Sequence, residues 1–152
     1  MLDNVIQDSG FASLMQKNIR ELIILFFEKE QNFGILCSIE NVSFDPKLPD
    51  SINSEFRSLT LFFLAGYTFE TARITDDMLV FEAGFGPDNF GSLVSVPLLS
   101  IMQIIIDETP VFINLASRKI KRVVEKKADN HGVKNSMASF LSNPENSKFI
   151  KK

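Results

Sequence analysis

The sequence predicts a small, mainly β domain with helices: a partly open antiparallel barrel capped by an N-terminal helix and followed by a flexible tail. Hydrophobic residues make up 45% of the 152 positions and fifteen are Phe, enough to fill the core of one domain. Between Leu59 and Ile106, short apolar runs alternate with turn signals, as in small β-proteins. The composition changes at Ser117, so we expect residues 1–116 to fold and residues 117–152 to form a basic, flexible linker.

The first expected element is a helix over residues 11–30. Its apolar side chains recur at spacings of three and four, which places them on one broad face. They are Leu14, Met15, Ile19, Leu22, Ile23, Phe26 and Phe27. Asp8 or Ser9 is positioned to cap the start, and Gly34 is available for a left-handed turn after the end. The broad face fits either packing on the domain's own sheet alone or an additional dimer interface.

Six short strands are expected after this helix. Each is apolar and bounded by turn residues. They are Gly34–Glu40, Leu59–Ala65, Tyr67–Ile74, Met78–Phe85, Leu93–Val96 and Val111–Leu115. Residues 41–53 contain two prolines and indicate an irregular excursion, whereas residues 75–77 indicate a hairpin turn. Pro97 is placed to start a short buried helix over Leu98–Ile106.

Charge is distributed unevenly along the chain. Residues 1–116 contain six Lys or Arg and sixteen Asp or Glu, a balance of −10; residues 117–152 contain ten and three, a balance of +7. The acidic body is a poor candidate for binding nucleic acid, because Lys and Arg must neutralise the phosphates. The basic tail is typical of solvating or protein-binding segments, with non-specific contact to nucleic acid as an alternative.

The sequence lacks the marks of secreted and membrane proteins. Its longest apolar run is far shorter than the roughly 20 residues that span a membrane. Asp3 precedes any Lys, unlike the basic start of a signal peptide. A single cysteine, Cys37, cannot form an intrachain disulfide. We therefore expect a cytoplasmic protein without a membrane partner.

No group of residues points to catalysis, a metal or a cofactor. The one histidine, His131, lies in the predicted tail, where nothing holds it in the geometry that a nucleophile needs. With Cys37 it supplies two of the roughly four ligands that zinc requires. Residues 84–91 (GFGPDNFG) lack the third glycine and the Lys-Ser/Thr ending of phosphate-binding loops. We therefore expect a protein that is not an enzyme.

A surface on the third and fourth strands is the candidate binding site. Alternation along a strand places every second side chain on a common face. The two sets are Tyr67, Phe69, Thr71 and Arg73 on the third strand, and Leu79, Phe81, Ala83 and Phe85 on the fourth. A face with aromatic residues, a small Ala and one Arg suits an extended peptide. The alternative is that these Phe side chains simply form the core.

Taken in order, these segments resemble the stringent starvation protein B (SspB) family of adaptors, which deliver tagged proteins to the ClpXP protease. The resemblance covers roughly residues 14–116 and the last few residues, and the α-proteobacterial branch is the most similar. The family pattern is a strand with an aromatic residue, a Thr-acid turn and a strand ending in Ser-Phe-Gly-Gly. Its matches are Phe69, Ile74, Thr75, Asp76, Phe85 and Gly86. Residues 94–101 and 111–115 are similar to the strand before a Pro-started helix and to the final strand.

The resemblance implies an Sm/SH3-like open barrel, a homodimer formed through the N-terminal helix, and a groove for ssrA-type tag peptides on substrates. It also implies a linker whose end docks on the N-terminal domain of the ClpX unfoldase. The dimer residues are then Leu22, Ile23, Phe26 and Phe27. The peptide-binding residues are Tyr67, Phe69, Arg73, Phe81, Ala83, Phe85 and Gly86. The docking residues are Lys148, Phe149, Ile150, Lys151 and Lys152, with residues 120–124 (IKRVV) as a second candidate.

Two departures from the family pattern keep other functions open. Pro87 replaces the second glycine of Gly-Gly, and residues 88–91 (DNFG) look inserted beside the expected groove. The body is also strongly acidic for a protein that would bind an acidic tag. The alternatives are an Sm-like RNA-binding module and a divergent peptide-binding adaptor for another degron.

Overall fold

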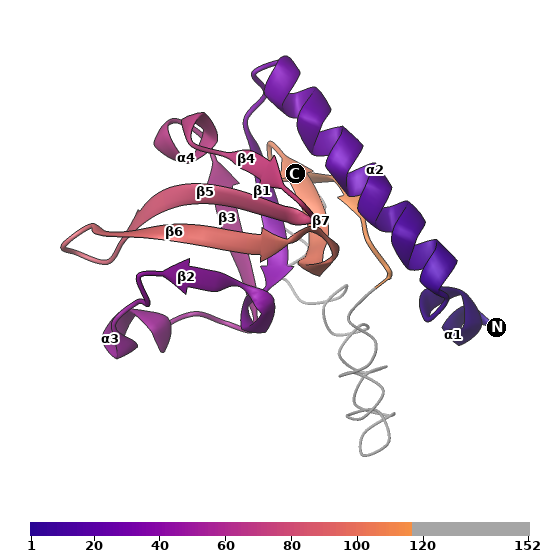
Figure 1. Cartoon of the computed structure of the whole chain (residues 1–152), viewed down its shortest axis with the longest axis horizontal. Coiled ribbons are helices and arrows are strands. Elements are labelled where there is room, and N and C mark those ends of the chain that lie inside the picture. The colour runs from indigo at the N-terminus through magenta and orange to yellow at the C-terminus, as the bar shows by residue number, and fades with distance from the viewer. Residues whose placement is uncertain (117–152) are drawn as a thin grey trace.

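The computed structural model describes residues 1–116, which form two antiparallel sheets and four α-helices (Figure 1). One sheet has the strand order β3 (Leu59–Leu64), β1 (Phe33–Ser38), β7 (Ile101–Ile106) and β8 (Thr109–Ile113). The other has the order β2 (Ser43–Asp45), β6 (Phe90–Pro97), β5 (Met78–Phe85) and β4 (Arg73–Thr75). The prediction of a mainly β domain with helices is confirmed. Within the described residues the sheets stay separate, and no closed barrel forms.

The long helix α2 (Ser9–Glu28) lies diagonally across one side of the sheets, with the short helix α1 (Leu2–Ile6) before it (Figure 1). Of the two predicted caps, Asp8 and Ser9, it is Asp8 that caps α2: its carboxylate accepts a hydrogen bond of 2.8 Å from the Phe11 N–H. The left-handed residue after the helix is Glu30, with φ of 53°, and Gly34 lies in β1 instead. No helix in residues 1–116 is long and apolar enough to cross a membrane.

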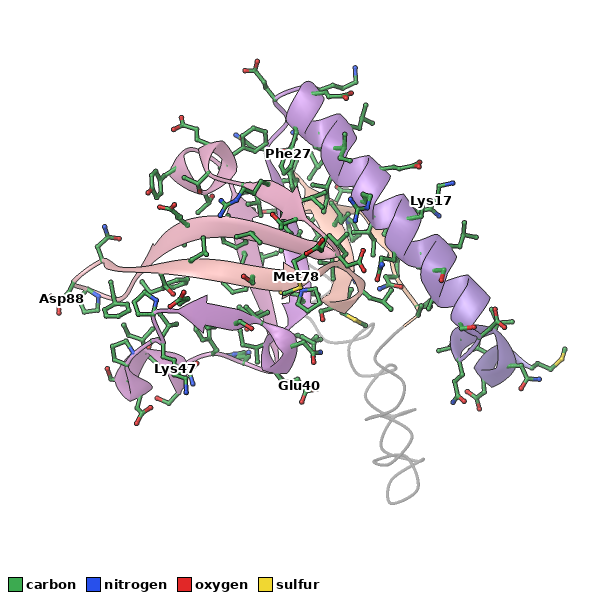
Figure 2. All side chains as sticks on the ribbon, in the orientation of Figure 1. Lys17, Phe27, Glu40, Lys47, Met78 and Asp88 are labelled. Carbon is green, nitrogen blue, oxygen red and sulfur yellow. The ribbon has the colours of Figure 1, made fainter. Side chains whose placement is uncertain are left out.

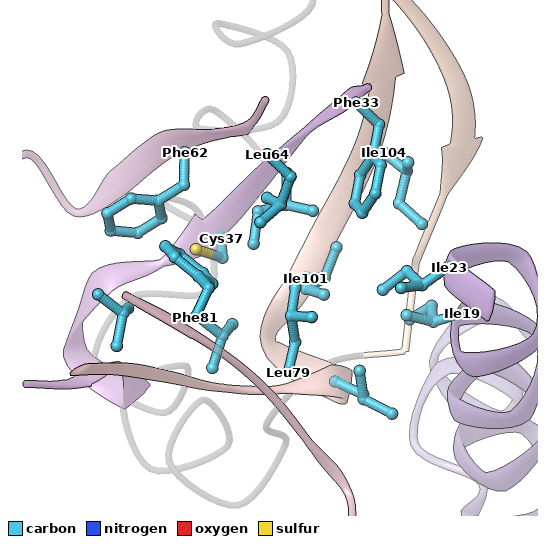
Figure 3. Packing of buried hydrophobic residues seen from close by; sticks show 14 of the residues in the cluster. Ile19, Ile23, Phe33, Cys37, Phe62, Leu64, Leu79, Phe81, Ile101 and Ile104 are labelled. Atoms are coloured by element: carbon cyan, nitrogen blue, oxygen red, sulfur yellow. The ribbon is translucent and has the colours of Figure 1, made fainter. Parts of the chain in front are cut away.

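The core lies between the two sheets and α2. Figure 3 shows Ile19 and Ile23 of α2 directed at Ile104 of β7. On the far side of the core, the rings of Phe62 and Phe81 lie 5.8 Å apart. Arg20 fixes α2 to the turn between β4 and β5, because its guanidinium donates to the Asp76 carbonyl and to the Asp77 carboxylate, the latter at 3.2 Å.

Two predicted elements differ in the structure. Residues 98–106 were expected to be a helix, but only η2 (Leu98–Ser100) is helical, and β7 follows it. Ile101–Ile106 contains four Ile, whose β-branched side chains suit a strand, and β1 offers an antiparallel partner for it. The excursion at residues 41–53 contains β2 and the short helix α3 (Asp50–Asn53), with η1 (Ile39–Asn41) before them.

The β5–β6 hairpin is the longest strand pair in the domain. Its register runs from Phe85 opposite Phe90 to Met78 opposite Pro97. The connection between the predicted strands Met78–Phe85 and Leu93–Val96 is shorter than expected, because β6 already begins at Phe90. Gly86 and Asn89 take positive φ values of 74° and 53°, which the tight turn requires and which Gly and Asn tolerate best. The Asn89 N–H donates to the Gly86 carbonyl at 3.1 Å and closes the loop.

Cys37 in β1 is fully buried, and burial raises the pKa of its thiol from the ordinary value of 9.0 to about 12. Since the folded state resists ionisation, Cys37 contributes stability below pH 9 that is lost as the pH rises from 9.0 towards 12. We expect the free energy of unfolding of the wild-type protein to fall more steeply over this range than that of Cys37→Val, a change of similar volume. Urea unfolding at a series of pH values measures both, and parallel pH profiles would contradict the burial of the thiol.

Candidate functional site

An open groove with a volume of about 730 Å³ lies on the face of the β2-β6-β5-β4 sheet that points away from the core. Residues from β2, β5 and β6, from the segment after β3, from α4 and from the hairpin loop line it. They are Asp45, Pro46, Ala65, Tyr67, Thr68, Glu82, Ala83, Gly84, Asn89, Gly91, Ser92 and Leu93. The β5–β6 hairpin forms the floor, and the chain after β3 and the end of β2 form the two sides.

Two glycines face each other across the hairpin in the floor, and one of them leaves its backbone uncovered. Gly84 pairs with Gly91, and the next pair on the same face is Glu82 with Leu93. A Cβ atom on Gly84 would lie 1.8 Å from Oδ1 of Asn89, so the Asn89 side chain occupies that space. A Cβ atom on Gly91 would meet no atom within 4 Å. Glycine at such positions lets another backbone approach closely.

One side of the groove is α4 (Tyr67–Glu70), a short helix where a strand was predicted. Gly66, with φ of 61°, redirects the chain out of β3. The Thr68 hydroxyl then accepts from the Ala65 N–H at 2.9 Å and donates to the Phe63 carbonyl at 2.7 Å. The predicted strand at residues 67–74 is therefore wrong except for β4 at its end, because these local hydrogen bonds outweigh the strand preference of Tyr, Thr and Phe.

Tyr67 and Glu82 join the side of the groove to its floor. The Tyr67 hydroxyl donates to the Glu82 carboxylate at 2.6 Å, and the Tyr67 side chain stays 60% exposed. The hydrogen bond to Glu82, together with its negative charge, raises the pKa of Tyr67. The pair presents an aromatic ring and a carboxylate side by side to solvent.

The edge of β5 beside the groove has no neighbouring strand over part of its length. β4 pairs with β5 only from Met78 to Val80. The Glu82 N–H donates to the Thr71 hydroxyl at 2.9 Å instead of to a strand. No described residue pairs as a strand with that edge from Ala83 to Phe85. A strand edge of this kind can accept an added peptide strand.

The seven residues predicted to bind a peptide divide into three groups. Tyr67 and Ala83 line the groove, although Ala83 is 8% exposed and also contacts the core. Three Phe residues pack inward, as the alternative prediction stated. Phe81 is 1% exposed, Phe69 packs against Phe27 at 5.7 Å, and Phe85 packs against Phe44 at 5.6 Å.

The remaining two residues are Arg73 and Gly86, and neither lines the groove. Arg73 donates to the Thr71 carbonyl at 3.0 Å, and Gly86 forms the hairpin turn. The sequence analysis missed Glu82, Gly84 and Gly91, the outward-facing residues of the hairpin. The sequence contained a pattern that indicates the residues on β5. Side chains alternate along a strand, so the neighbours of Phe81 and Ala83 must face the opposite way.

The predicted dimer residues of α2 face mainly the core of this chain. Ile23 and Phe26 are buried, and Leu22 and Phe27 are partly buried against the core. A second copy would therefore not contact Ile23 and Phe26. The apolar residues exposed on α1 and α2 are a different set: Leu2, Val5, Leu14, Ile24 and Leu25.

The structure does not describe every residue that the sequence predicted to be functional. The candidate docking residues, 148–152 and 120–124, lie outside the described residues. Over the described part of the chain, no three His, Cys, Asp or Glu side chains gather as a metal ion would need.

Neither protein-family models nor curated proteins match this chain.

Placing Phe81 in the core predicts its effect on stability. Phe81→Ala removes a fully buried ring and should lower the free energy of unfolding by about 3–5 kcal/mol. Phe63→Ala is the matched control, because Phe63 is 60% exposed and its loss should cost less than about 1 kcal/mol. Urea unfolding monitored by circular dichroism measures both values. Equal losses in the two variants would show that Phe81 is not a core residue.

Proposed function

We propose that this protein is a non-enzymatic, cytoplasmic adaptor that binds ssrA-type degradation-tag peptides and tethers tagged proteins to the ClpXP protease. The observation that carries the proposal is the unpaired edge of β5 beside a groove whose floor is uncovered at Gly91. The resemblance of the sequence to the SspB family supports it. We also propose that the two sheets correspond to the open Sm/SH3-like barrel of that family.

The groove suits a peptide bound mainly through its backbone. An extended peptide beside Ala83–Phe85 would pair with free backbone groups of β5, and the open space over Gly91 would leave room for it in the groove. Main-chain hydrogen bonds supply affinity without requiring one particular side chain. Such a site needs no covalent chemistry.

The basic segment after residue 116 supplies the second half of the proposed adaptor. Residues 117–152 are basic, and the chain ends in Lys-Phe-Ile-Lys-Lys, an apolar pair among lysines. If this end docks on the N-terminal domain of ClpX, the bound substrate is held at an effective concentration on the order of millimolar. Delivery then follows from proximity alone.

The exposed apolar residues at the N-terminus support a homodimer. Leu14, Ile24 and Leu25 are exposed on α2, and Leu2 and Val5 on α1. Covering them would remove apolar surface from water, which favours association. We propose that this surface, rather than Ile23 and Phe26, forms the contact between two copies.

Charge argues against the RNA-binding alternative. The groove contains Asp45 and Glu82, and none of its lining residues is Lys, Arg or His. A phosphate backbone would meet like charges there with no cation to neutralise it. The acidic lining therefore disfavours RNA as the ligand.

Gly91→Val tests the groove directly. Valine suits a strand, and the added atoms point into open space, so the variant should keep its melting temperature within a few degrees. It should bind a fluorescein-labelled ssrA-type tag peptide at least about tenfold more weakly, because the side chain fills the floor that the peptide backbone must approach. Fluorescence anisotropy measures the affinity. Thr109→Val, an exposed change on β8 in the other sheet, is the control. A folded Gly91→Val protein that binds normally would remove the groove as the peptide site.

The tether is tested by deleting residues 148–152. Tag-peptide affinity should be unchanged, while stimulation of ClpXP degradation of a tagged fluorescent protein should be lost, because the substrate is no longer held near the unfoldase. The control deletes residues 143–147 (NPENS), which shortens the tail equally but keeps its end. Full stimulation without residues 148–152 would rule out this end as the docking segment.

A further inference from the structure

The β3-β1-β7-β8 sheet is apolar on its outward face as well as on its core face. None of its four strands contains a charged residue. The register places Phe62, Ile35 and Ile104 on the side of the core. Since side chains alternate along a strand, the next row points outward, and it consists of Leu61, Leu36, Gln103 and Ile113. An antiparallel sheet whose outward face meets only water is normally polar there, so this face indicates a binding surface.

The exposed part of this face is most continuous along β8. Val111 and Ile113 are 48% and 55% exposed, whereas Phe112 between them packs against the core. Leu115 continues the alternation and is 41% exposed. We call Val111, Ile113 and Leu115 the β8 strip. Covering the strip would remove apolar surface from water, which favours a bound partner there.

The chain leaves the described domain at a fixed point beside the strip. The Asn114 side chain donates to the carbonyls of Leu99, at 3.2 Å, and of Ile101, at 2.9 Å. Its oxygen accepts from the Ala116 N–H at 2.9 Å. These hydrogen bonds hold the backbone through Ala116 against η2 and the start of β7. The residues that follow Ala116 therefore begin next to the β8 strip.

We propose that residues 117–124 (SRKIKRVV) bind the β8 strip of their own chain, and that their three apolar side chains cover it. These side chains are Ile120, Val123 and Val124. The inference goes beyond the proposed adaptor function and does not depend on it.

The connection is long enough for this contact and short enough to favour it. Ile120 follows Ala116 by four residues, so the two lie at most about 14 Å apart. Ile113 lies about 10 Å back along the strand from Ala116, within that reach. So short a connection keeps the segment at an effective concentration of about millimolar or more near the strip, without the cost of bringing two molecules together.

Charge favours the segment over a second copy as the occupant of the strip. Residues 117–127 contain six Lys or Arg and one Glu, a balance of +5, whereas residues 1–116 carry −10. The segment therefore brings the opposite charge to the domain, and a second copy would bring a second body of −10. The strip itself is uncharged, so the Lys and Arg side chains of the segment can extend past it into water.

This contact would decide between the two candidate docking segments. Residues 120–124, held on the β8 strip, would not be free to dock on ClpX. They would instead fix the point at which the tether begins, and residues 125–152 would supply its reach. Residues 148–152 would then be the end that is available to a partner.

Trypsin provides the test, because it cleaves after Lys and Arg. Residues 117–124 contain four such sites, and Lys134 is a reference site farther along the same chain. In the full chain, cleavage within residues 117–124 relative to cleavage at Lys134 should be at least about tenfold slower than in a synthetic peptide of residues 117–152, because trypsin cleaves the segment only when it has left the strip. Mass spectrometry of timed digests measures both rates.

Variants of the β8 strip locate the contact. Ile113→Asp places a charge in the strip and should reduce the protection to about twofold or less, whereas Ile113→Val should keep it. Lys17→Gln is the matched control for charge, because it lowers the net charge by the same one unit at a side chain that projects from α2 away from the sheets (Figure 2). It should keep the full protection. Val111→Asp replaces Ile113→Asp if the latter lowers the melting temperature by more than about 5 °C.

The inference is overturned if the relative cleavage rates in the full chain and in the peptide agree within about twofold. Full protection in the folded Asp variant would also overturn it. An equal loss in Lys17→Gln would assign the effect to overall charge. Protection that falls on about hundredfold dilution would assign the strip to a second copy instead. The assay contains neither tag peptide nor ClpXP, so each of these outcomes leaves the proposed adaptor function to its own tests.

Discussion

The register of the β5–β6 hairpin is the constraint on which the rest of the domain depends. In this register Gly84 faces Gly91 and Glu82 faces Leu93 on the groove side, whereas Phe81 turns into the core. Side chains alternate between the two faces of a strand, so a slip of one residue would bury the Glu82 carboxylate and expose the Phe81 ring. The positive φ angles at the loop residues and the aromatic core both oppose such a slip.

The groove and the core are built from the same short segments. Phe69 anchors α4 between Phe27 and Phe33, and Tyr67, two residues earlier, points to the groove. Because α4 replaces an extension of β4, the edge of β5 stays free beside Ala83–Phe85. The packing of Phe69 against the core therefore determines where α4 lies and, with it, the position of Tyr67 at the side of the groove.

The site is defined by its shape and by its charge. Asp45 and Tyr67 lie at its sides, and its floor carries Glu82, Leu93 and the uncovered backbone of Gly91. Such a surface can distinguish ligands by extension and charge, which is what an adaptor requires. The opposite charges of residues 1–116 and 117–152 fit the proposed function, in which the acidic body would receive the peptide and the basic segment would contact the unfoldase.

The sequence alone was sufficient to predict α2, to place its cap at Asp8 or Ser9 and to predict the alternation of side chains along β5. Each of these features depends on the spacing of residues within one segment. It was insufficient at Tyr67–Glu70 and at Ile101–Ile106, where short apolar runs fit a helix or a strand equally well. Pairing with β1 made the second run a strand, and the turn at Gly66 with the Thr68 hydroxyl made the first a helix. The groove residues Glu82, Gly84 and Gly91 became recognisable only then, since contacts between distant segments decide which face of a strand is covered and which edge stays free.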